Sequence, residues 1–234
     1  NFVAGVNAGN SIVSGGNYNT VVGDEAGTAI TTADDCTAVG KSALQANTTG
    51  FAQTAVGSGA LATSTGSENT AVGYQALNNS VGATSNTAVG YRSLDTNTTA
   101  DNNTSVGHLA MYANTTGASN VALGQGALRN NTTGTYDTAS GYRALFNNTT
   151  GSYNAAFGRL SLEANTTGNE NTAIGNAALY LNTTGINNTA TGSASLGANT
   201  TGSYNTSVGQ SALPVSTTGQ YNVANGYESL KANT

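Results

Sequence analysis

The side chains capable of acid–base chemistry are few in this sequence and do not recur in step with one another. His108 is the single histidine. It directly follows a glycine, in a position that elsewhere holds Lys41 or Tyr74, so we interpret it as an exposed surface residue. The 11 acidic residues form no constant pair of carboxylates of the kind that glycoside hydrolysis requires. The sequence therefore predicts no catalytic residues and a protein that is not an enzyme.

Two further patterns resemble ligand sites in composition only. Asp24, Glu25, Asp34 and Asp35 form the densest acidic group, and hard cations such as Ca²⁺ need several oxygen ligands. Their spacing matches no calcium-binding loop, so a solvated acidic loop is the favoured interpretation. Residues 57–62 read G-S-G-A-L-A, which fits a dinucleotide fingerprint, but they lack the strand–helix–strand context that such a site needs. We predict no metal and no cofactor.

Tyrosines are the strongest candidates for binding, because an aromatic ring buries a large area at a low entropic cost. They occupy two sequence columns, one directly after a recurring glycine and one directly before a recurring N-T or N-A step. Such rows suit contact with a sugar or a protein, or they cover turns and seal a seam between chains. The sequence leaves both interpretations open. The candidate surface-binding residues are Tyr74, Tyr91, Tyr142, Tyr153, Tyr204, Tyr221 and Tyr227.

These columns exist because the chain repeats itself every 17 residues, with the consensus N-T-A-V-G-x-x-A-L-x-x-N-T-T-G-x-x. A repeat this short cannot hold a helical hairpin or a propeller blade, so each copy is predicted to form one coil of an all-β, parallel β-solenoid of about 13 coils. A single interval, from Gly57 to Gly73, has 16 residues. The motif's first glycine recurs at Gly23, Gly40, Gly57, Gly73, Gly90, Gly107, Gly124, Gly141, Gly158, Gly175, Gly192, Gly209 and Gly226.

The columns around that glycine predict the interior of a coil. A T-A-V segment such as residues 37–39 alternates a β-branched rank with a small rank, which is typical of a short strand. The A-L step is predicted to be a second strand whose leucine fills the interior, and N-T-T-G closes the coil with turn residues. The predicted core ladder consists of Leu44, Leu61, Leu77, Leu94, Met111, Leu128, Leu145, Leu162, Leu179, Leu196, Leu213 and Leu230.

Asparagines that match the glycosylation signal N-x-S/T recur with the same period. Stacked coils would bring equivalent asparagines to about 4.8 Å from one another, which is too close for a glycan on every coil. A ladder of asparagine hydrogen bonds is therefore the favoured interpretation. The recurring asparagines are Asn47, Asn97, Asn114, Asn131, Asn148, Asn165, Asn182 and Asn199.

Composition narrows the possible partners. Only 7% of the residues are charged and the net charge is −5, so the chain lacks the clustered basic face that nucleic-acid binding needs. No apolar run is long enough to span a membrane, and we expect no membrane contact by this segment. Cys36 is the single cysteine and occupies the column of the repeat's first asparagine, which favours a small, half-buried structural thiol over a disulfide between chains of an oligomer.

The repeat also divides the chain. Residues 1–36 are interpreted as degenerate and irregular first coils, and residues 37–234 as the regular solenoid. No polar cap is recognisable at either end, although solenoids need caps to cover the edges of their terminal coils. We therefore expect an interior segment of a longer fibre protein.

The N-T-A-V-G and A-L-x-x-N-T-T-G pieces, from about Asn17 to Thr234, resemble the YadA-like head repeats of trimeric autotransporter adhesins, whose core motif is similar to S-V-A-I-G. They look equally like repeats in the fibre proteins of phages and marine bacteria. The resemblance implies a left-handed parallel β-roll in a homotrimer of identical chains. It also implies an extracellular place, on a cell surface or a virion, and a host-surface glycan or protein as partner.

Three functions compete at this point. The first is a structural, adhesive extracellular fibre segment, either an adhesin head or a tail-fibre shaft. The alternative is a monomeric ice-binding solenoid, although N-T-T-G places adjacent threonines on opposite sides and the strand reads T-x-V, so the hydroxyl array is incomplete. A depolymerising tailspike would need carboxylates that converge in a groove, which the scattered acidic residues do not predict.

Overall fold

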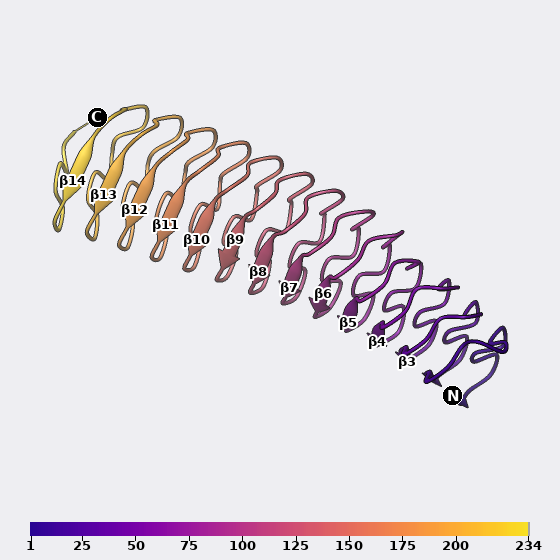
Figure 1. The fold of residues 1–234 in the computed structure, drawn as a ribbon. Helices are drawn as coiled ribbons and strands as arrows, with labels where there is room; N and C mark the ends of the chain where they lie inside the picture. The colour runs from indigo at the N-terminus through magenta and orange to yellow at the C-terminus, as the bar shows by residue number, and fades with distance from the viewer. Residues whose placement is uncertain (234) are drawn as a thin grey trace. The chain divides into compact units, whose positions relative to one another are not determined.

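The structure, a computed structural model, describes residues 1–233. It is all-β and forms a parallel β-solenoid of about 13 coils with a repeat of about 17 residues, as the sequence predicts. The chain comprises two compact units, Asn1–Ser119 and Asn120–Thr234. Within each unit, successive coils carry one short strand on the same side (Figure 1). The predicted boundary at residue 36 falls inside the first unit and stays an interpretation of the sequence.

In the first unit, each strand pairs in parallel with the strand of the next coil. Equal positions of the repeat lie opposite one another, so Thr37 pairs with Thr54. The short coil keeps this register, because Thr54 still pairs with Thr70. The strands are β1 (Phe2–Ala4), β2 (Thr20–Val22), β3 (Thr37–Val39), β4 (Thr54–Val56), β5 (Thr70–Val72), β6 (Thr87–Val89) and β7 (Thr104–Val106).

The second unit has the same parallel arrangement and the same register. Ala155 pairs with Thr172, and Phe157 pairs with Ile174, each 17 residues further along the chain. The strands are β8 (Val121–Leu123), β9 (Thr138–Ser140), β10 (Ala155–Phe157), β11 (Thr172–Ile174), β12 (Thr189–Thr191), β13 (Thr206–Val208) and β14 (Val223–Asn225).

Each strand from β2 to β14 directs its middle side chain inward and the other two outward, whereas all three residues of β1 are exposed. In β4, Ala55 is fully buried, whereas Thr54 and Val56 are half-buried on the outer side. This confirms the predicted alternation of the two ranks, and it shows that the small rank lies inside and the β-branched rank outside. The outer side of the strand is therefore a surface that repeats from coil to coil.

The predicted second strand at the A-L step is wrong, because the described residues form turns there. In the coil that begins at Gly40, Ser42 and Leu44 have φ angles of 54° and 53°. Extended backbone needs strongly negative φ, so two left-handed residues with one residue between them cannot continue a strand. The Ala43 N–H instead donates to the Gly40 carbonyl oxygen at 3.2 Å and closes a turn.

Hydrogen bonds between coils continue through these turns, although only three residues of each coil are strand. In the same coil, the Ser42 N–H donates to the Asp24 carbonyl of the preceding coil at 2.9 Å. The Leu44 N–H donates to the Ala60 carbonyl of the following coil at 3.0 Å. The turn backbone thus finds its partners in both neighbouring coils, as buried polar groups require.

The A-L leucines fill the interior of the coils. From Leu44 to Leu213, and including Met111, every member of the predicted core ladder is fully buried. They pack beside buried alanines such as Ala38 and Ala43. Leu230 differs, with 44% of its surface exposed, because no further coil covers it within residues 1–233. The core prediction is wrong at that position.

Two columns of asparagine side chains lie in the interior beside the leucines. In one column, the Asn165 Nδ2 donates to the Asn148 Oδ1 at 2.9 Å and to the Gly168 carbonyl at 3.0 Å. In the other, both the backbone N–H and the Nδ2 of Asn188 donate to the Asn171 Oδ1, at 3.0 and 3.2 Å. The predicted asparagine ladder is confirmed. All eight recurring N-x-S/T asparagines are fully buried, so the folded coils shield them from glycosylation.

The invariant glycine satisfies two backbone requirements at once. Gly141 has a φ of 144°, a region that L side chains rarely adopt. A Cβ atom on Gly141 would also lie 2.5 Å from the carbonyl oxygen of Gly158 in the next coil. The column is glycine because the backbones of adjacent coils approach too closely here for any side chain.

Irregular coils of the first unit contain compensating pairs of residues. Gly27 stands in the leucine column and Ile30 in the column of buried asparagines. Ile30 is fully buried, and its Cδ1 lies 2.8 Å from where a Cβ on Gly27 would be, so isoleucine fills the space of the absent leucine. In the short coil, Ser64 replaces the longer asparagine, and its Oγ donates to the Oε1 of Gln53 at 3.0 Å.

Candidate surface-binding site

The outer side of the strands is free of charged residues in both units. In each of β2–β7, the first residue of the strand is threonine and the third is valine, and both lie on this outer side. In β8–β14 the third residue of the strand varies widely. A repeated, uncharged sheet face of this kind suits contact with another uncharged surface. The residues at the varied position are Leu123, Ser140, Phe157, Ile174, Thr191, Val208 and Asn225.

The seven candidate tyrosines lie at the surface along the two borders of that strand face. One row, which includes Tyr153, stands two residues before the strand, and the other, which includes Tyr142, stands two residues after it. All seven side chains are between 42% and 74% exposed. The structure thus places every predicted binding residue where a ligand can reach it.

Neighbouring rings in these rows stack on one another. His108 belongs to such a stack, which the sequence interpretation of a simple exposed residue did not include. Stacking covers one face of each ring in a pair, so the outer faces, the edges and the hydroxyl groups remain for a ligand. The stacked rings, with their centroid separations and interplanar angles, are Tyr74–Tyr91 (5.5 Å, 12°), Tyr91–His108 (5.2 Å, 12°), Tyr136–Tyr153 (5.1 Å, 14°) and Tyr204–Tyr221 (5.1 Å, 6°).

Tyr142 has a different environment from the stacked tyrosines. The same column holds Gln125 in the preceding coil and Arg159 in the following coil. The Arg159 guanidinium lies 5.9 Å from the centre of the Tyr142 ring, within the range of a weak cation–π contact. Tyr142 is therefore an exposed tyrosine whose column neighbours are not aromatic.

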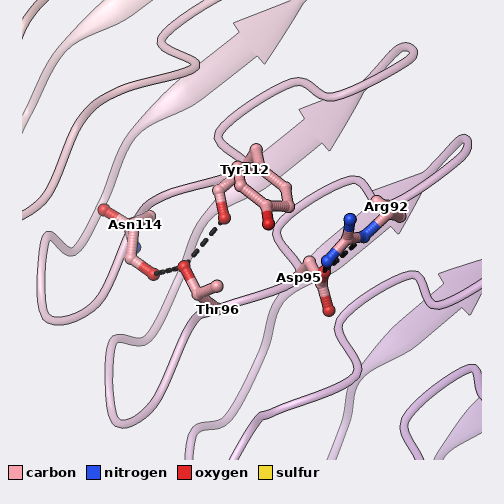
Figure 2. A network of polar contacts seen from close by, with 5 residues as sticks. All are labelled: Arg92, Asp95, Thr96, Tyr112 and Asn114. Carbon is pink, nitrogen blue, oxygen red and sulfur yellow. Dashed lines mark hydrogen bonds and ion pairs between the residues drawn. The ribbon is translucent and has the colours of Figure 1, made fainter.

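The sequence did not predict the polar cluster that Figure 2 shows at the turn after β6. The Arg92 Nε donates to the Oδ2 of Asp95 at 2.7 Å, and Asp95 is only 1% exposed. The guanidinium also lies 4.7 Å from the centre of the Tyr112 ring. The Thr96 Oγ1 donates to the carbonyls of Tyr112 and Asn114, at 2.8 and 3.1 Å. The spacing of arginine and aspartate by three residues was the available signal.

The second unit contains a comparable cluster at the same turn of its coils. Arg143 forms an ion pair with the almost fully buried Glu163 of the next coil. The guanidinium groups of Arg143 and Arg129 lie 4.2 and 5.4 Å from the centre of the Phe146 ring. Each cluster neutralises a buried carboxylate, which would be costly to leave unpaired. The clusters therefore stabilise the turns in which they lie.

Asp137 is the one acidic residue within the asparagine ladder. Its side chain is fully buried, and it accepts the Asn154 N–H at Oδ1 (2.8 Å) and the Asn148 Nδ2 at Oδ2 (3.1 Å). Burial raises the pKa of the Asp137 carboxyl to about 7, although these hydrogen bonds oppose the shift. In the next coil, the Asn154 Nδ2 donates to the Gly168 carbonyl at 2.9 Å. Asp137 has no N–H group at this position of the ladder, and a carboxyl can donate a hydrogen bond only when it is protonated.

Cys36 is a free thiol that is almost fully buried, with 1% of its surface exposed, whereas its column predicts a half-buried one. Its Sγ lies 3.3 Å from the carbonyl oxygen of Gly50, the kind of acceptor that an asparagine bonds in other coils. Burial raises the pKa of the Cys36 thiol, which favours the unreactive protonated form.

The acidic group near the N-terminus is bonded to polar groups of the chain. The Asp34 Oδ1 accepts the Asn17 N–H at 2.7 Å, and the Glu25 Oε2 accepts the Ser42 hydroxyl at 3.2 Å. Among residues 1–233, no three histidine, cysteine or acidic side chains gather closely enough to hold a metal ion. The same residues include no helix that is long and apolar enough to cross a membrane.

Comparisons of this chain with protein-family models, with curated proteins and with solved structures find no match. The repeated surface, which consists of the strand face and the tyrosine rows on its borders, is the feature of this chain best suited to binding.

Proposed function

We propose that this chain is a structural segment of an adhesive extracellular fibre, on a cell surface or a virion, in which three identical chains associate and present rows of tyrosines. The observation that carries the proposal is one outer surface repeated on coils that bond to the coils before and after them. Such a stack lengthens without altering existing coils, which suits a fibre. A left-handed coil is part of the proposal, on the strength of the resemblance to YadA-like head repeats.

The strand face supports association of chains. In the second unit, Leu123, Phe157 and Ile174 each expose more than 40% of their surface along this face. Burial of apolar surface contributes about 25 cal/mol for each Å² removed from water. The interior of a single coil buries little apolar surface, since it contains one leucine among alanines. Contact between the strand faces of associated chains would bury additional apolar surface.

Solution mass by light scattering tests the trimer. We expect three times the chain mass of 23.1 kDa. Ile174→Lys should dissociate the assembly, because it places a charge on the strand face. Leu181→Lys is the matched control, since Leu181 is also 43% exposed but lies outside the strands. A monomeric wild type, or equal loss of mass in both variants, would contradict the proposed interface.

The tyrosine rows are the proposed contact with a host-surface glycan or protein. Their hydroxyl edges can donate and accept hydrogen bonds, while the ring carbons supply apolar contact. Binding to an array of immobilised cell-surface glycans and proteins should fall at least tenfold in Tyr153→Ser, with an unchanged solution mass. Ser152→Ala, at the adjacent surface position, is the control that should bind as the wild type does. Equal binding by all three proteins would exclude the rows as the contact.

The first unit also favours a second candidate function, a monomeric ice-binding solenoid. Six successive strands, β2–β7, present the same Thr-x-Val pair outward in register. Adjacent strands lie about 4.8 Å apart, so the threonines form a regular row of hydroxyl and methyl groups. Both candidates need the same face: association of chains covers it, whereas ice binding requires it to be free.

An ice-recrystallisation assay separates the two functions. If ice binding holds, a monomeric wild type inhibits recrystallisation and Thr70→Lys, at the centre of the row, abolishes the effect. Thr116→Lys, in an exposed N-T-T-G turn, should retain it. A trimeric mass together with no inhibition would eliminate this candidate.

A further inference from the structure

Three pairs of tyrosines are held ring against ring on adjacent coils. The centroids of Tyr136 and Tyr153 are 5.1 Å apart, with an interplanar angle of 14°. The other pairs are Tyr204–Tyr221 at 5.1 Å and Tyr74–Tyr91 at 5.5 Å. Each pair spans one period of the repeat, so the coil-to-coil register fixes its separation.

These rings are also accessible to small oxidants. All six side chains expose between 46% and 74% of their surface. Exposed side chains change rotamer on the picosecond-to-nanosecond timescale, so a stacked pair can bring ring edges together without any change in the backbone. The backbone beneath the Tyr136–Tyr153 pair is the same in both coils, with φ of 58° and 61°.

We propose that these stacked pairs are sites of oxidative modification, at which adjacent coils become covalently joined through dityrosine. The oxidant is hydrogen peroxide acting through a haem peroxidase. Each phenol of a pair loses one electron and one proton to give a tyrosyl radical. The two radicals form a carbon–carbon bond between the ring positions next to the hydroxyls. The hydrogen on each of these carbons then moves to the oxygen, which restores both phenols.

The electrons and protons of this step balance. One dityrosine releases two electrons and two protons in total, and one hydrogen peroxide consumes them to form two water molecules. Coupling within a stacked pair outcompetes coupling between molecules, because groups held in contact react at an effective concentration far above that of dissolved protein. The proposal concerns the chemistry of the surface and does not depend on the fibre function.

Cross-linked pairs would tie each coil to the next across one period of the chain. Such a bond restricts the unfolded chain as a disulfide does, so oxidation should raise the temperature at which the linked coils unfold. The chain's single cysteine, Cys36, is buried and cannot supply such a link. Tyrosine pairs are thus the residues on this surface that can fasten coils covalently.

The test is to treat the full chain with a haem peroxidase and hydrogen peroxide and to map the products by mass spectrometry. We expect dityrosine fluorescence, a mass lower by two hydrogen atoms per link, and linked peptides that contain Tyr136 with Tyr153. The yield per chain should not change when the protein is diluted tenfold. Tyr153→Phe should eliminate that linked peptide and leave the Tyr204–Tyr221 link intact.

Tyr142→Phe is the matched control, because Tyr142 is exposed but has no tyrosine in its column on either adjacent coil. This variant should give the same linked peptides as the wild type. Links that form mainly between molecules, or that involve Tyr142 as often as Tyr153, would overturn the proposal. So would the absence of dityrosine under conditions that couple free tyrosine.

Discussion

The two compact units differ in which part of the coil repeats uniformly, the outer strand face in the first and a column of buried asparagines in the second. The first has a uniform outer face, with threonine and valine on each of β2–β7, but an irregular interior in which Ile30, Gln53 and Ser64 replace asparagines. The second has five successive coils with the same buried asparagine, from Asn131 to Asn199, but an outer face that changes from strand to strand.

This difference shows that the interior and the outer face vary independently. Two interior exceptions of the first unit are compensating pairs, Gly27 with Ile30 and Ser64 with Gln53, because buried volume and hydrogen bonds are conserved there. Outer positions need no such pairing, since the second unit forms the same coil with Ser140 and with Phe157. Folding therefore does not require the uniform valines of the first unit, and we expect contact with another surface to explain them.

A charge in the shared leucine interior should have the largest effect. Leu162→Asp is expected to lower the free energy of unfolding by about 5 kcal/mol, because it buries an unpaired carboxylate. Hydrogen exchange should lose protection in its coil and the adjacent coils and retain it in distant ones. Leu230→Asp, at an exposed position, is the control. A uniform loss of protection along the chain would contradict the nearest-neighbour picture.

Substitution of the recurring glycine should have the second largest effect on the free energy of unfolding, and the effect should be equal in both units. Gly141→Ala places a Cβ 2.5 Å from a backbone oxygen at a positive φ, and we expect a loss of about 4 kcal/mol in urea unfolding. Gly82→Ala is the control, because Gly82 has a φ of 77° but no atom within 4 Å of the new Cβ. Its expected cost is about 1–2 kcal/mol, from the left-handed backbone alone. Equal costs would mean that backbone approach is unimportant.

Asp137 is the one acidic residue in an interior column of asparagines in the second unit, and it should make that unit sensitive to pH. Its folded pKa of about 7 lies above the ordinary value of 3.8, so the folded state binds the proton more tightly than the unfolded state. This contribution is fully present below about pH 4 and is lost as the pH rises to about 7, by up to about 4 kcal/mol.

Unfolding of two complementary variants measures this effect. Asp137→Asn should stabilise the chain at pH 8 and flatten its stability between pH 4 and 7. Asn171→Asp, which places a carboxyl in the same column, should introduce a second loss over the same pH range. If Asp137→Asn leaves the pH profile unchanged, the buried carboxyl is not the cause.

Single and double substitutions should show that Gly27 and Ile30 of the first unit compensate for one another. Ile30→Asn leaves the space beside Gly27 unfilled, and we expect a loss of about 2–3 kcal/mol, as for other large-to-small core changes. Adding Gly27→Leu should recover most of it, because the coil then has the regular leucine and asparagine. Thermal unfolding of the single and double variants gives the coupling. Strictly additive effects would show that the two positions do not compensate.

The smallest effect is expected on the outer face. Val72→Phe in the first unit and Phe157→Val in the second should each change the free energy of unfolding by less than about 0.5 kcal/mol. Surface contact should respond differently, with Val72→Phe reducing whichever activity of the uniform face is found, chain association or ice binding. A large loss of stability in Val72→Phe would mean that the valines are uniform for folding reasons.

The period of the sequence was sufficient to predict the solenoid, the strand and the leucine interior, because each recurs in a fixed column. It did not predict that the A-L step is a turn. Leucine is rarely found at positive φ, so nothing in the type of Leu44 indicates a φ of 53°. The tyrosine rows were visible as columns, but their stacking depends on side-chain rotamers, which no column specifies. The Arg143–Glu163 pair joins different coils, and only the alignment of adjacent repeats would have suggested it.

The short coil between Gly57 and Gly73 has a consequence for how such a chain can evolve. It lacks one residue in its N-T-T-G turn, yet its strand keeps the register of its neighbours. A slip in copying the gene that removes one codon from a turn is therefore tolerated, and in-frame duplication of a whole repeat adds one coil between two compatible ones. Recombination between near-identical repeats can then change the length of the protein in steps of one coil, without a new folding problem at any step.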